Sequence, residues 1–522
     1  MNSSWVDLEI LPKIHYEFAT CSCMAQQGLS RYSIDSDWSR LFIAGEWRES
    51  EDGETFAVED PSTRETVAKA PKATEADVEA AYEAAAASQK EWKQTPPARR
   101  EELVHNLLQQ LEEHSEEIVE LMAYEAGSVQ GMGETSVHLT SDQIAEAATM
   151  PRRMRGEHAT SNIPGKENII QRVPEGVVTV ISPWNFPLNL SARAVVPAVA
   201  AGNTVVLKPA SNSAITGGLV FGRLFEDAGF PDGVFNVVTG HGSEIGDAVA
   251  GHEESDVVAF TGSTNVGRRV AATAGENLAV PAMELGGNNA HIVTADADID
   301  DAVDAAVFGS FFHQGQICIS INRHLVHEDI YDEYIEKLTE RAENLPVGSA
   351  HDEVAIGPII DESQRDEMLD YVESTVEAGA TLETGGETVD LDGVDNSLVV
   401  KPTVISDATN DMAAACNEHF GPIAPVIPFS DVDVAIELAN DTKYGLSGSV
   451  HAGDVGAGKR IAEQIDTGMI HVNDQPVNDE GHVPFGGTGA SGVGTYNTDA
   501  YLDEVTEKKW ISLQHEPREF PF

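Results

Sequence analysis

The run GVVTVIS (residues 176–182) begins a regular alternation of strand-like and helix-like segments. Three further valine-rich runs follow it: NTVVLKP (203–209), FNVVTG (235–240) and VVAFTG (257–262). Helix-like segments lie between or after these runs, at residues 187–201, 211–229, 243–251 and 264–275. Short apolar strands that alternate with helices are typical of a parallel sheet covered on both faces. The sequence therefore predicts an α/β fold, with ligands bound beyond the carboxyl ends of the strands.

Other segments extend this pattern in both directions. Apolar residues at helical spacing predict helices at 73–93 and 97–127, before the valine-rich runs. From about Asn288 a second α/β region is expected, with helical stretches at 299–313, 329–345 and 362–379 and strand-like runs at 398–405, 424–429 and 468–473. Turn signals at Gly156, Pro164 and Gly165 predict a hairpin over residues 154–173.

The charge balance is strongly acidic, with 87 acidic residues against 32 basic ones and a formal net charge of −55. Nucleic acid and anionic membranes both need a positive patch, so neither is an expected partner. The acidic residues are dispersed rather than gathered in a tail. Dispersed acidity with little lysine suits a protein that stays hydrated in concentrated salt, where the repulsion is screened, so we expect a halophilic host.

Only four cysteines occur, at positions 21, 23, 318 and 416, in a chain of 522 residues. They form neither a disulfide framework nor paired CxxC motifs, and the histidines form no HxxH or HExxH pattern, so a cytoplasmic protein without a metal site is expected. No stretch of 18 consecutive apolar residues predicts a membrane span. Residues 1–23 differ in composition from the rest, and we expect an N-terminal extension there, with the functional chain beginning near Met24.

Three residues are candidates for chemistry, and each also has a plain structural explanation. Cys318 in GQICIS (315–320) is either a nucleophile or a small buried side chain. Glu284 in MELGGNNA (283–290) precedes a Gly-Gly turn, where a carboxylate can project into a cleft or simply be solvated. Asn185 stands near two prolines in PWNFP, either as a rigid amide donor or as a turn residue.

Taken together, the motifs resemble those of the aldehyde dehydrogenase superfamily. Eight of them follow the family's order over residues 41–510: SPWNFP, VLKPAS, FTGSTNVG, MELGGNNA, GQICIS, EHFGPIAPV, YGLSGSV and PFGG. The resemblance implies a Rossmann-like cofactor domain, an α/β catalytic domain and a small β oligomerisation element. These would comprise residues 24–153 with 175–286, residues 287–486, and residues 154–174 with 487–522.

The resemblance also implies a mechanism. Cys318 would attack the aldehyde carbonyl, while the side-chain amide of Asn185 and the backbone N–H of Cys318 hold the oxyanion. Hydride would then pass to a nicotinamide and leave a thioester on the cysteine. Glu284 would activate the water that hydrolyses this thioester. A nucleophile, an amide donor and a carboxylate are the parts that acyl-enzyme chemistry needs.

The same resemblance implies binding of NAD or NADP. Lys208 would reach the adenosine ribose, Gly262 and Ser263 the pyrophosphate, and Glu418 and Phe420 the nicotinamide ribose and ring. Five further residues would complete the cofactor site: Ser182, Pro183, Trp184, Gly240 and Gly286. Ser211 stands where many NAD-preferring relatives carry a glutamate that repels a 2′-phosphate, so acceptance of NADP is expected.

The substrate is expected to be a small aldehyde. SNSAITGG (211–218), residues 473–494 and EVTEKKWISLQ (504–514) look like the aromatic-aldehyde branch, which includes benzaldehyde and salicylaldehyde dehydrogenases. Aliphatic aldehydes or semialdehydes remain alternatives. An acylating, CoA-dependent enzyme is disfavoured, because Glu284 would hydrolyse its thioester, and a non-catalytic protein is disfavoured by the complete set of site residues. The hairpin and the C-terminal tail would support a homodimer or homotetramer.

Overall fold

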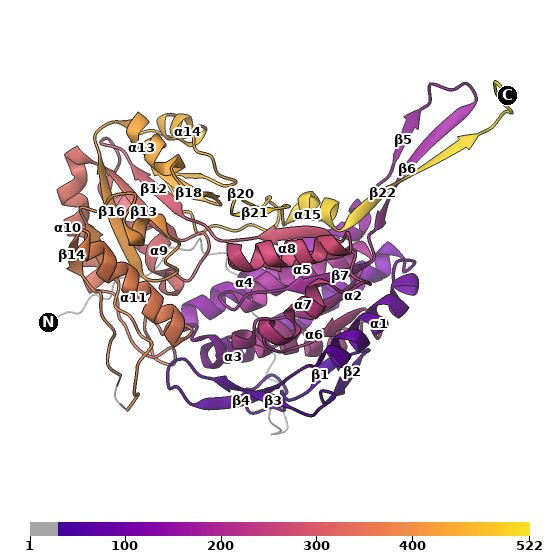
Figure 1. Ribbon diagram of the computed structural model, residues 1–522, viewed down its shortest axis with the longest axis horizontal. Coiled ribbons are helices and arrows are strands. Elements are labelled where there is room, and N and C mark those ends of the chain that lie inside the picture. Colours follow the sequence, from indigo (N-terminus) through magenta and orange to yellow (C-terminus); the bar gives the residue numbers. More distant parts are fainter. Residues whose placement is uncertain (1–29, 392) are drawn as a thin grey trace.

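The computed structural model describes residues 30–391 and 393–522, so the expected extension at 1–23 lies outside the described residues. Two α/β units lie side by side, and a narrow β arm projects from one of them (Figure 1). This arrangement confirms the predicted fold class. The limits given above for the individual domains stay predictions.

The first unit is built on an eight-stranded sheet in the order β2-β1-β9-β8-β7-β10-β11-β21. Strands β9, β8, β7, β10 and β11 pair in parallel, as the valine-rich runs predict. The strands are β1 (Leu41–Ile43), β2 (Glu46–Arg48), β7 (Val177–Ile181), β8 (Thr204–Lys208), β9 (Phe235–Val237), β10 (Val257–Thr261), β11 (Val280–Glu284) and β21 (Gly492–Val493). Their side chains are buried on both faces in β7 to β10, which explains the continuous apolar runs.

Helices cover both faces of this sheet (Figure 1). The helices of this unit are α1 (Glu75–Trp92), α2 (Pro97–Glu113), α3 (Ser115–Ala126), α4 (Gln130–Arg153), α5 (Pro187–Ala201), α6 (Val220–Ala228), α7 (Gly242–Ala250) and α8 (Thr264–Glu276). The predicted helix at 97–127 is interrupted at His114, and the one at 211–229 contains a 3₁₀ turn η1 (Ser211–Ser213) and a π-helix η2 (Ile215–Leu219) before α6. Every residue of α5 is buried, between the sheet and α4.

The second unit contains a seven-stranded sheet in the order β14-β15-β16-β13-β12-β18-β19. Its strands are β12 (Asn289–Val293), β13 (Ile321–His327), β14 (Thr381–Thr384), β15 (Thr403–Ser406), β16 (Ile423–Phe429), β18 (Gly448–His451) and β19 (His471–Val472). Helices α9 (Ile299–Phe311), α10 (Tyr331–Glu343), α11 (Glu362–Glu377), α12 (Ala413–Cys416), α13 (Val432–Asn440) and α14 (Val455–Ala462) surround it. The strand expected at 398–405 begins only at Thr403, because Val399 and Val400 make isolated bridges instead.

The β arm confirms the predicted hairpin. Strands β5 (Glu157–Thr160) and β6 (Lys166–Pro174) form it, and β22 (Thr506–Gln514) adds a third antiparallel strand beside β6 (Figure 1). The preceding C-terminal segment lies elsewhere: β20 (Thr488–Gly489) pairs with β17 (Tyr444–Gly445), and α15 (Thr498–Glu504) packs on α4 and α5. A hairpin of β3 (Thr55–Glu59) and β4 (Thr66–Pro71) completes the fold. Within the described residues, no helix is long and apolar enough to cross a membrane.

Candidate functional site

Cys318 lies in the loop between α9 and β13. Just before it, His313, Gln314 and Gly315 all have positive φ, with values of 50°, 56° and 67°. Gly315 permits no side chain, because a Cβ there would lie 2.2 Å from the carbonyl oxygen of Gly421. The Cys318 carbonyl accepts a hydrogen bond of 2.9 Å from the Nδ2 atom of Asn289, at the start of β12. The loop is therefore held in one tight conformation, with the cysteine side chain partly buried.

Asn185 lies next to this loop. It follows β7 and precedes α5, and its side chain is 4% exposed. The Nδ2 atom donates a 2.9 Å hydrogen bond to the carbonyl oxygen of Gln316, two residues before Cys318. An amide nitrogen carries two hydrogens, so one N–H remains for an oxygen bound near the thiol. The structure thus brings together two residues that are 133 positions apart in the sequence.

Glu284 is the last residue of β11, at the carboxyl end of the strand. Its side chain is 2% exposed, and neither carboxyl oxygen has a hydrogen-bond partner among the described residues. Burial raises the pKa of Glu284 well above its ordinary value, while the charge of Arg193 lowers it and that of Asp479 raises it. A buried carboxyl without partners is suited to exchange a proton rather than to stabilise the fold.

The Cys318 thiol is held in its protonated form. Its pKa is raised to about 12, mainly by burial and also by the negative charge of Glu418, while Arg193 acts in the opposite direction. Glu284 and Asp479 also raise it. A thiol in this setting needs a base to take its proton before it can act as a nucleophile.

Predicted cofactor residues follow the carboxyl ends of β7 to β10, at one edge of the first sheet. Ser182, Pro183 and Trp184 follow β7, Lys208 ends β8, Gly240 follows β9, and Gly262 and Ser263 follow β10. The Ser182 N–H donates to the Lys208 carbonyl at 3.2 Å, which ties two of these strand ends together. Ser263 caps α8 by accepting from the N–H of Val266, and the other N–H groups of the first turn stay available for an anion.

Lys208 is buried, and among the described residues its Nζ atom donates only to the carbonyl oxygen of Pro209, at 3.2 Å. Burial lowers the pKa of Lys208 to about 8. Ser211 lies in η1 and is half-buried, with its hydroxyl 3.4 Å from the Oδ1 atom of Asn212. This part of the expected ribose site therefore consists of the Lys208 amine and the Ser211 hydroxyl. Position 211 carries no carboxylate.

Gly286 and Glu418 meet across the two units. A Cβ on Gly286 would lie 2.0 Å from Glu418 Oε2, and the N–H of Gly287 donates to Glu418 Oε1 at 3.0 Å. Burial raises the pKa of Glu418 to about 7, although this hydrogen bond opposes the shift. Phe420 has a φ of 50°, and its ring meets Trp184 edge-on, with centroids 5.5 Å apart. A carboxylate for ribose hydroxyls and rings for a flat heterocycle fit a nicotinamide nucleotide here.

Arg193 and Asp479 were not predicted as site residues, yet they form a buried ion pair beside the site. Arg193 belongs to α5, and Asp479 to the loop between β19 and β20. The guanidinium also lies 4.1 Å from the centre of the Phe485 ring. One feature of the sequence could have indicated Arg193 as a site residue, because it is the only charged residue between positions 176 and 207.

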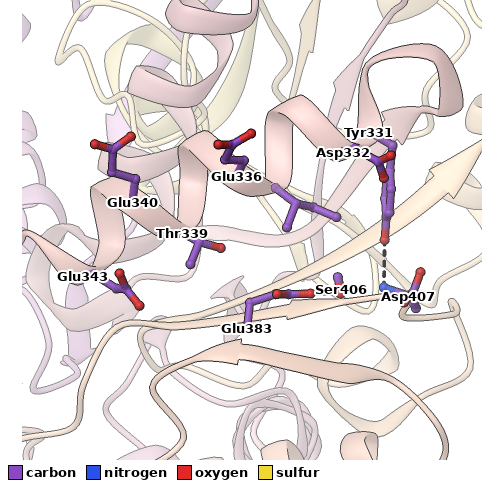
Figure 2. Close-up of a pocket in the computed structure, with 10 residues that line it drawn as sticks. Tyr331, Asp332, Glu336, Thr339, Glu340, Glu343, Glu383, Ser406 and Asp407 are labelled. Atoms are coloured by element: carbon purple, nitrogen blue, oxygen red, sulfur yellow. Dashed lines mark hydrogen bonds between the residues drawn. The ribbon is translucent and has the colours of Figure 1, made fainter.

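Two other features lie apart from this site. A surface pocket of about 480 Å³ between α10 and β15 contains none of the predicted residues. Its lining includes Glu336, Glu340 and Glu343 of α10 and Glu383 of β14 (Figure 2). Cys416 stands two residues before Glu418, a position that favours packing near the site, yet it is exposed at the end of α12. In the described part of the chain, no three potential ligands gather as a metal site.

Comparisons with known proteins agree with this geometry. Residues 47–511 match the model of the aldehyde dehydrogenase family. The chain is similar to a vanillin dehydrogenase of Corynebacterium glutamicum, with 44% identity over 92% of this chain and 98% of the relative. It is 43% identical to a benzaldehyde dehydrogenase of Bacillus subtilis, over 93% and 99%. A crystal structure of betaine aldehyde dehydrogenase from Staphylococcus aureus in complex with NAD+ superposes with a TM-score of 0.90, at 32% identity over 93% and 96%.

Proposed function

Because the chain belongs to the aldehyde dehydrogenase family, we propose that it oxidises an aromatic aldehyde to the carboxylic acid with NAD or NADP. The observations that support this proposal are the hydrogen bond from Asn185 to the Cys318 loop and the effect of the Glu284 charge on the Cys318 thiol. The names of relatives at 43–44% identity, a vanillin and a benzaldehyde dehydrogenase, support the aromatic substrate. Glu284, as a hydrolytic base, favours release of a free acid over transfer to CoA.

The chain's own residues supply the first half of the reaction. Cys318 gives up its proton to solvent water, its sulfur bonds to the aldehyde carbon, and the carbonyl oxygen becomes an oxyanion. The free N–H of Asn185 and the backbone N–H of Cys318 stabilise that charge. When bound, the nicotinamide supplies a hydride acceptor. The fixed loop conformation keeps the sulfur next to these donors throughout.

Glu284 acts in the second half of the reaction, the hydrolysis of the thioester. As a carboxylate it takes a proton from a water molecule, whose oxygen bonds to the thioester carbon. The carbon–sulfur bond then breaks, the carboxylic acid leaves, and the sulfur takes up the proton held by Glu284. Because the carboxyl has no competing partner among the described residues, a water molecule can be its hydrogen-bond partner.

The cofactor would lie across the strand ends of the first sheet. Gly262 and Ser263 would face the pyrophosphate, Lys208 the adenosine ribose, and Glu418 and Phe420 the nicotinamide half. Ser182, Pro183, Trp184, Gly240 and Gly286 would form the remaining walls. The hydroxyl of Ser211, in place of a carboxylate, supports the use of NADP as well as NAD.

The nucleophile is tested by comparing two cysteine variants. Cys318→Ala should abolish reduction of NAD and NADP by benzaldehyde and vanillin, whereas Cys416→Ala, a matched change at an exposed cysteine, should retain the wild-type rate. Each assay is run with and without CoA, in multimolar KCl. Aldehyde oxidation by Cys318→Ala would refute the assignment, and a requirement for CoA would refute hydrolysis. Exclusive oxidation of aliphatic aldehydes would refute the aromatic substrate.

We also propose the setting in which the enzyme works. The net charge of −55 supports a halophilic host, and the few cysteines support a cytoplasmic location. The β arm supports assembly as a homodimer or homotetramer, because a three-stranded sheet without helices gains stability from a partner surface.

A further inference from the structure

Three polar residues are spaced four apart from the turn before α5 into the helix: Asn185 precedes α5, and Asn189 and Arg193 lie within it. Residues four apart lie on the same face of a helix, and each such step advances about 6 Å along the axis. Asn185 is next to the Cys318 loop. Asn189 and Arg193 therefore continue a polar column away from the thiol, inside a helix whose residues are all buried.

Two hydrogen-bond donors in this column have no partner. The side chain of Asn189 is 1% exposed and that of Arg193 is 3% exposed. Within residues 30–391 and 393–522, neither Asn189 Nδ2 nor Arg193 Nε has an acceptor. The amide orientation is set, because Asn189 Oδ1 accepts from Arg193 Nη2 at 3.4 Å. Unpaired buried donors are rare in native proteins and costly, so an acceptor supplied by a ligand would explain them.

The column ends close to the base. The Arg193 guanidinium stacks on Phe485, and the next residue, Gly486, lies against Glu284, where a Cβ would be 3.4 Å from Oε1. Both Cys318 and Glu284 have pKa values that are shifted mainly by burial but also by the charges of Arg193 and Asp479. Arg193 thus lies close enough to Cys318 and Glu284 for its charge to act on both.

The charge of Arg193 is already balanced. Asp479 pairs with it, and that carboxylate also accepts from Asn497 Nδ2 at 3.0 Å and from Gln143 Nε2 at 3.5 Å. A second carboxylate brought by a substrate would add an unbalanced buried charge. A neutral oxygen would instead satisfy the free N–H groups without changing the local charge.

We propose that Asn189 and Arg193 are specificity-determining residues that bind an uncharged oxygen acceptor on the substrate, a hydroxyl or methoxy group on the aromatic ring. This inference rests on the proposed function and narrows it. Unsubstituted benzaldehyde leaves both donors unpaired, and a ring bearing a carboxylate adds a charge. Oxygenated aromatic aldehydes are the class that fits the column.

The first test uses substrates that match in size. Methoxybenzaldehyde is compared with ethylbenzaldehyde at the 3- and 4-positions, because the two groups have nearly equal volume and only methoxy accepts a hydrogen bond. At one ring position at least, kcat/KM should be about tenfold higher for methoxy, equivalent to about 1.4 kcal/mol. Ratios within threefold at both positions, or a preference for carboxybenzaldehyde over methoxybenzaldehyde, would overturn the inference.

The second test removes one donor. Asn189→Leu should lower kcat/KM for the preferred methoxy substrate about tenfold and leave its ethyl partner unchanged or improved. The matched control is Asn106→Leu, which makes the same change in α2, where the amide donates to the Ala228 carbonyl; it should keep the wild-type ratio. A parallel loss for both substrates in Asn189→Leu means a structural role and overturns the inference.

The outcomes separate this inference from the proposed function. If the wild-type enzyme oxidises methoxy and ethyl substrates equally well, the proposed oxidation of aromatic aldehydes is retained. Only the proposed role of Asn189 and Arg193 is then refuted. If it oxidises aliphatic aldehydes and no aromatic one, the proposed function falls, and the inference falls with it. The comparison of wild-type substrates needs no variant, so it is decisive even if Asn189→Leu fails to fold.

Discussion

The Glu284 carboxyl is buried without a partner, and this determines how the enzyme should respond to pH. Burial raises its pKa, so its neutral form persists to higher pH than that of a solvent-exposed glutamate. A general base must be ionised to accept a proton. We therefore expect kcat to rise as the pH increases through the pKa that Glu284 has in the folded enzyme. Glu284→Gln should lower kcat by about 10²- to 10⁴-fold, the usual contribution of a general base. Stopped-flow and steady-state assays across pH 5–10 measure both effects.

The same residue makes a linked prediction for stability. A carboxyl whose pKa is higher in the folded than in the unfolded state favours folding below the unfolded value, and this contribution is lost as pH rises through the folded value. Glutamine does not ionise, so Glu284→Gln should unfold at a higher temperature than wild type at alkaline pH, with the difference shrinking towards pH 4. A constant difference at every pH would contradict the burial argument.

Ser211 should control the choice between NAD and NADP. In Ser211→Glu, a carboxylate would face the 2′-phosphate of NADP, and like charges 4 Å apart repel by about 1–4 kcal/mol, depending on exposure to water. We expect kcat/KM with NADP to fall by about tenfold or more while that with NAD is kept. Ser211→Gln is the control, since it has nearly the same size without the charge. Equal effects of the two variants would show that size, not charge, acts here.

At the residue scale, the sequence predicts single motif residues better than pairs. Asn185 and Cys318 are found by their motifs, and the hydrogen bond from Asn185 to the Cys318 loop is consistent with their predicted roles. The partnership of Arg193 with Asp479 joins residues 286 positions apart, so no local pattern indicates it. Burial of their charges is a property of the packed helix α5, which appears only in three dimensions.

Among the elements, the π-helix η2 depends on a single side chain from α3. Glu125 accepts hydrogen bonds from the N–H groups of Ile215 and Thr216, both at 2.7 Å, and from the Thr216 hydroxyl at 2.6 Å. Glu125→Leu would leave two buried N–H groups unpaired, at about 1–3 kcal/mol each. We expect a loss of at least about 2 kcal/mol in the free energy of unfolding, measured by denaturant titration. Glu125→Gln, which keeps one acceptor oxygen, should lose less.

Glu125 should also make the stability of the protein depend on pH. Burial raises its pKa from 4.5 to about 7, against the effect of the hydrogen bonds from Thr216 and Ile215. Its folded-state pKa therefore exceeds the unfolded one, and wild type should lose stability relative to Glu125→Gln as pH rises from about 4.5 to above 7. Parallel stability curves for the two proteins would contradict the shift.

Elements with strong periodicity are the ones that the sequence predicts well. Strands β7 to β10 are confirmed because a parallel sheet buried on both faces requires continuous apolar runs. Helix α4 was not predicted: it contains Gly131, Gly133 and Pro151, and it is stabilised by packing against α2 and α5 rather than by its own propensity. The strand at 398–405 is shorter than expected, because valine-rich residues there make only isolated bridges.

The β arm is expected to contribute to the assembly of the oligomer. All nine residues of β22 pair with β6, yet most of their side chains are exposed, including Trp510 at 65%. Deletion of residues 506–522 should lower the mass measured by light scattering to that of a smaller oligomer or monomer. The control is deletion of residues 515–522, which follow β22 and leave its pairing intact. An unchanged mass after the longer deletion would contradict a role of the arm in assembly.

The whole molecule carries a net charge of −55, and its stability should therefore depend on salt. Carboxylates crowd the surface, as along α10 beside the pocket of Figure 2, with few bases to offset them. Repulsion between them reaches about 10 Å at 0.1 M salt but only about 3 Å at 1 M. We expect the unfolding temperature and the aldehyde activity to rise steeply from millimolar to molar KCl, and NaCl to act similarly.

Sucrose serves as the control, because it favours the compact state by exclusion from the surface without screening charge. If sucrose replaced KCl completely, or if fold and activity survived dialysis into millimolar salt, charge repulsion would not be the cause and the halophilic host would lose its support.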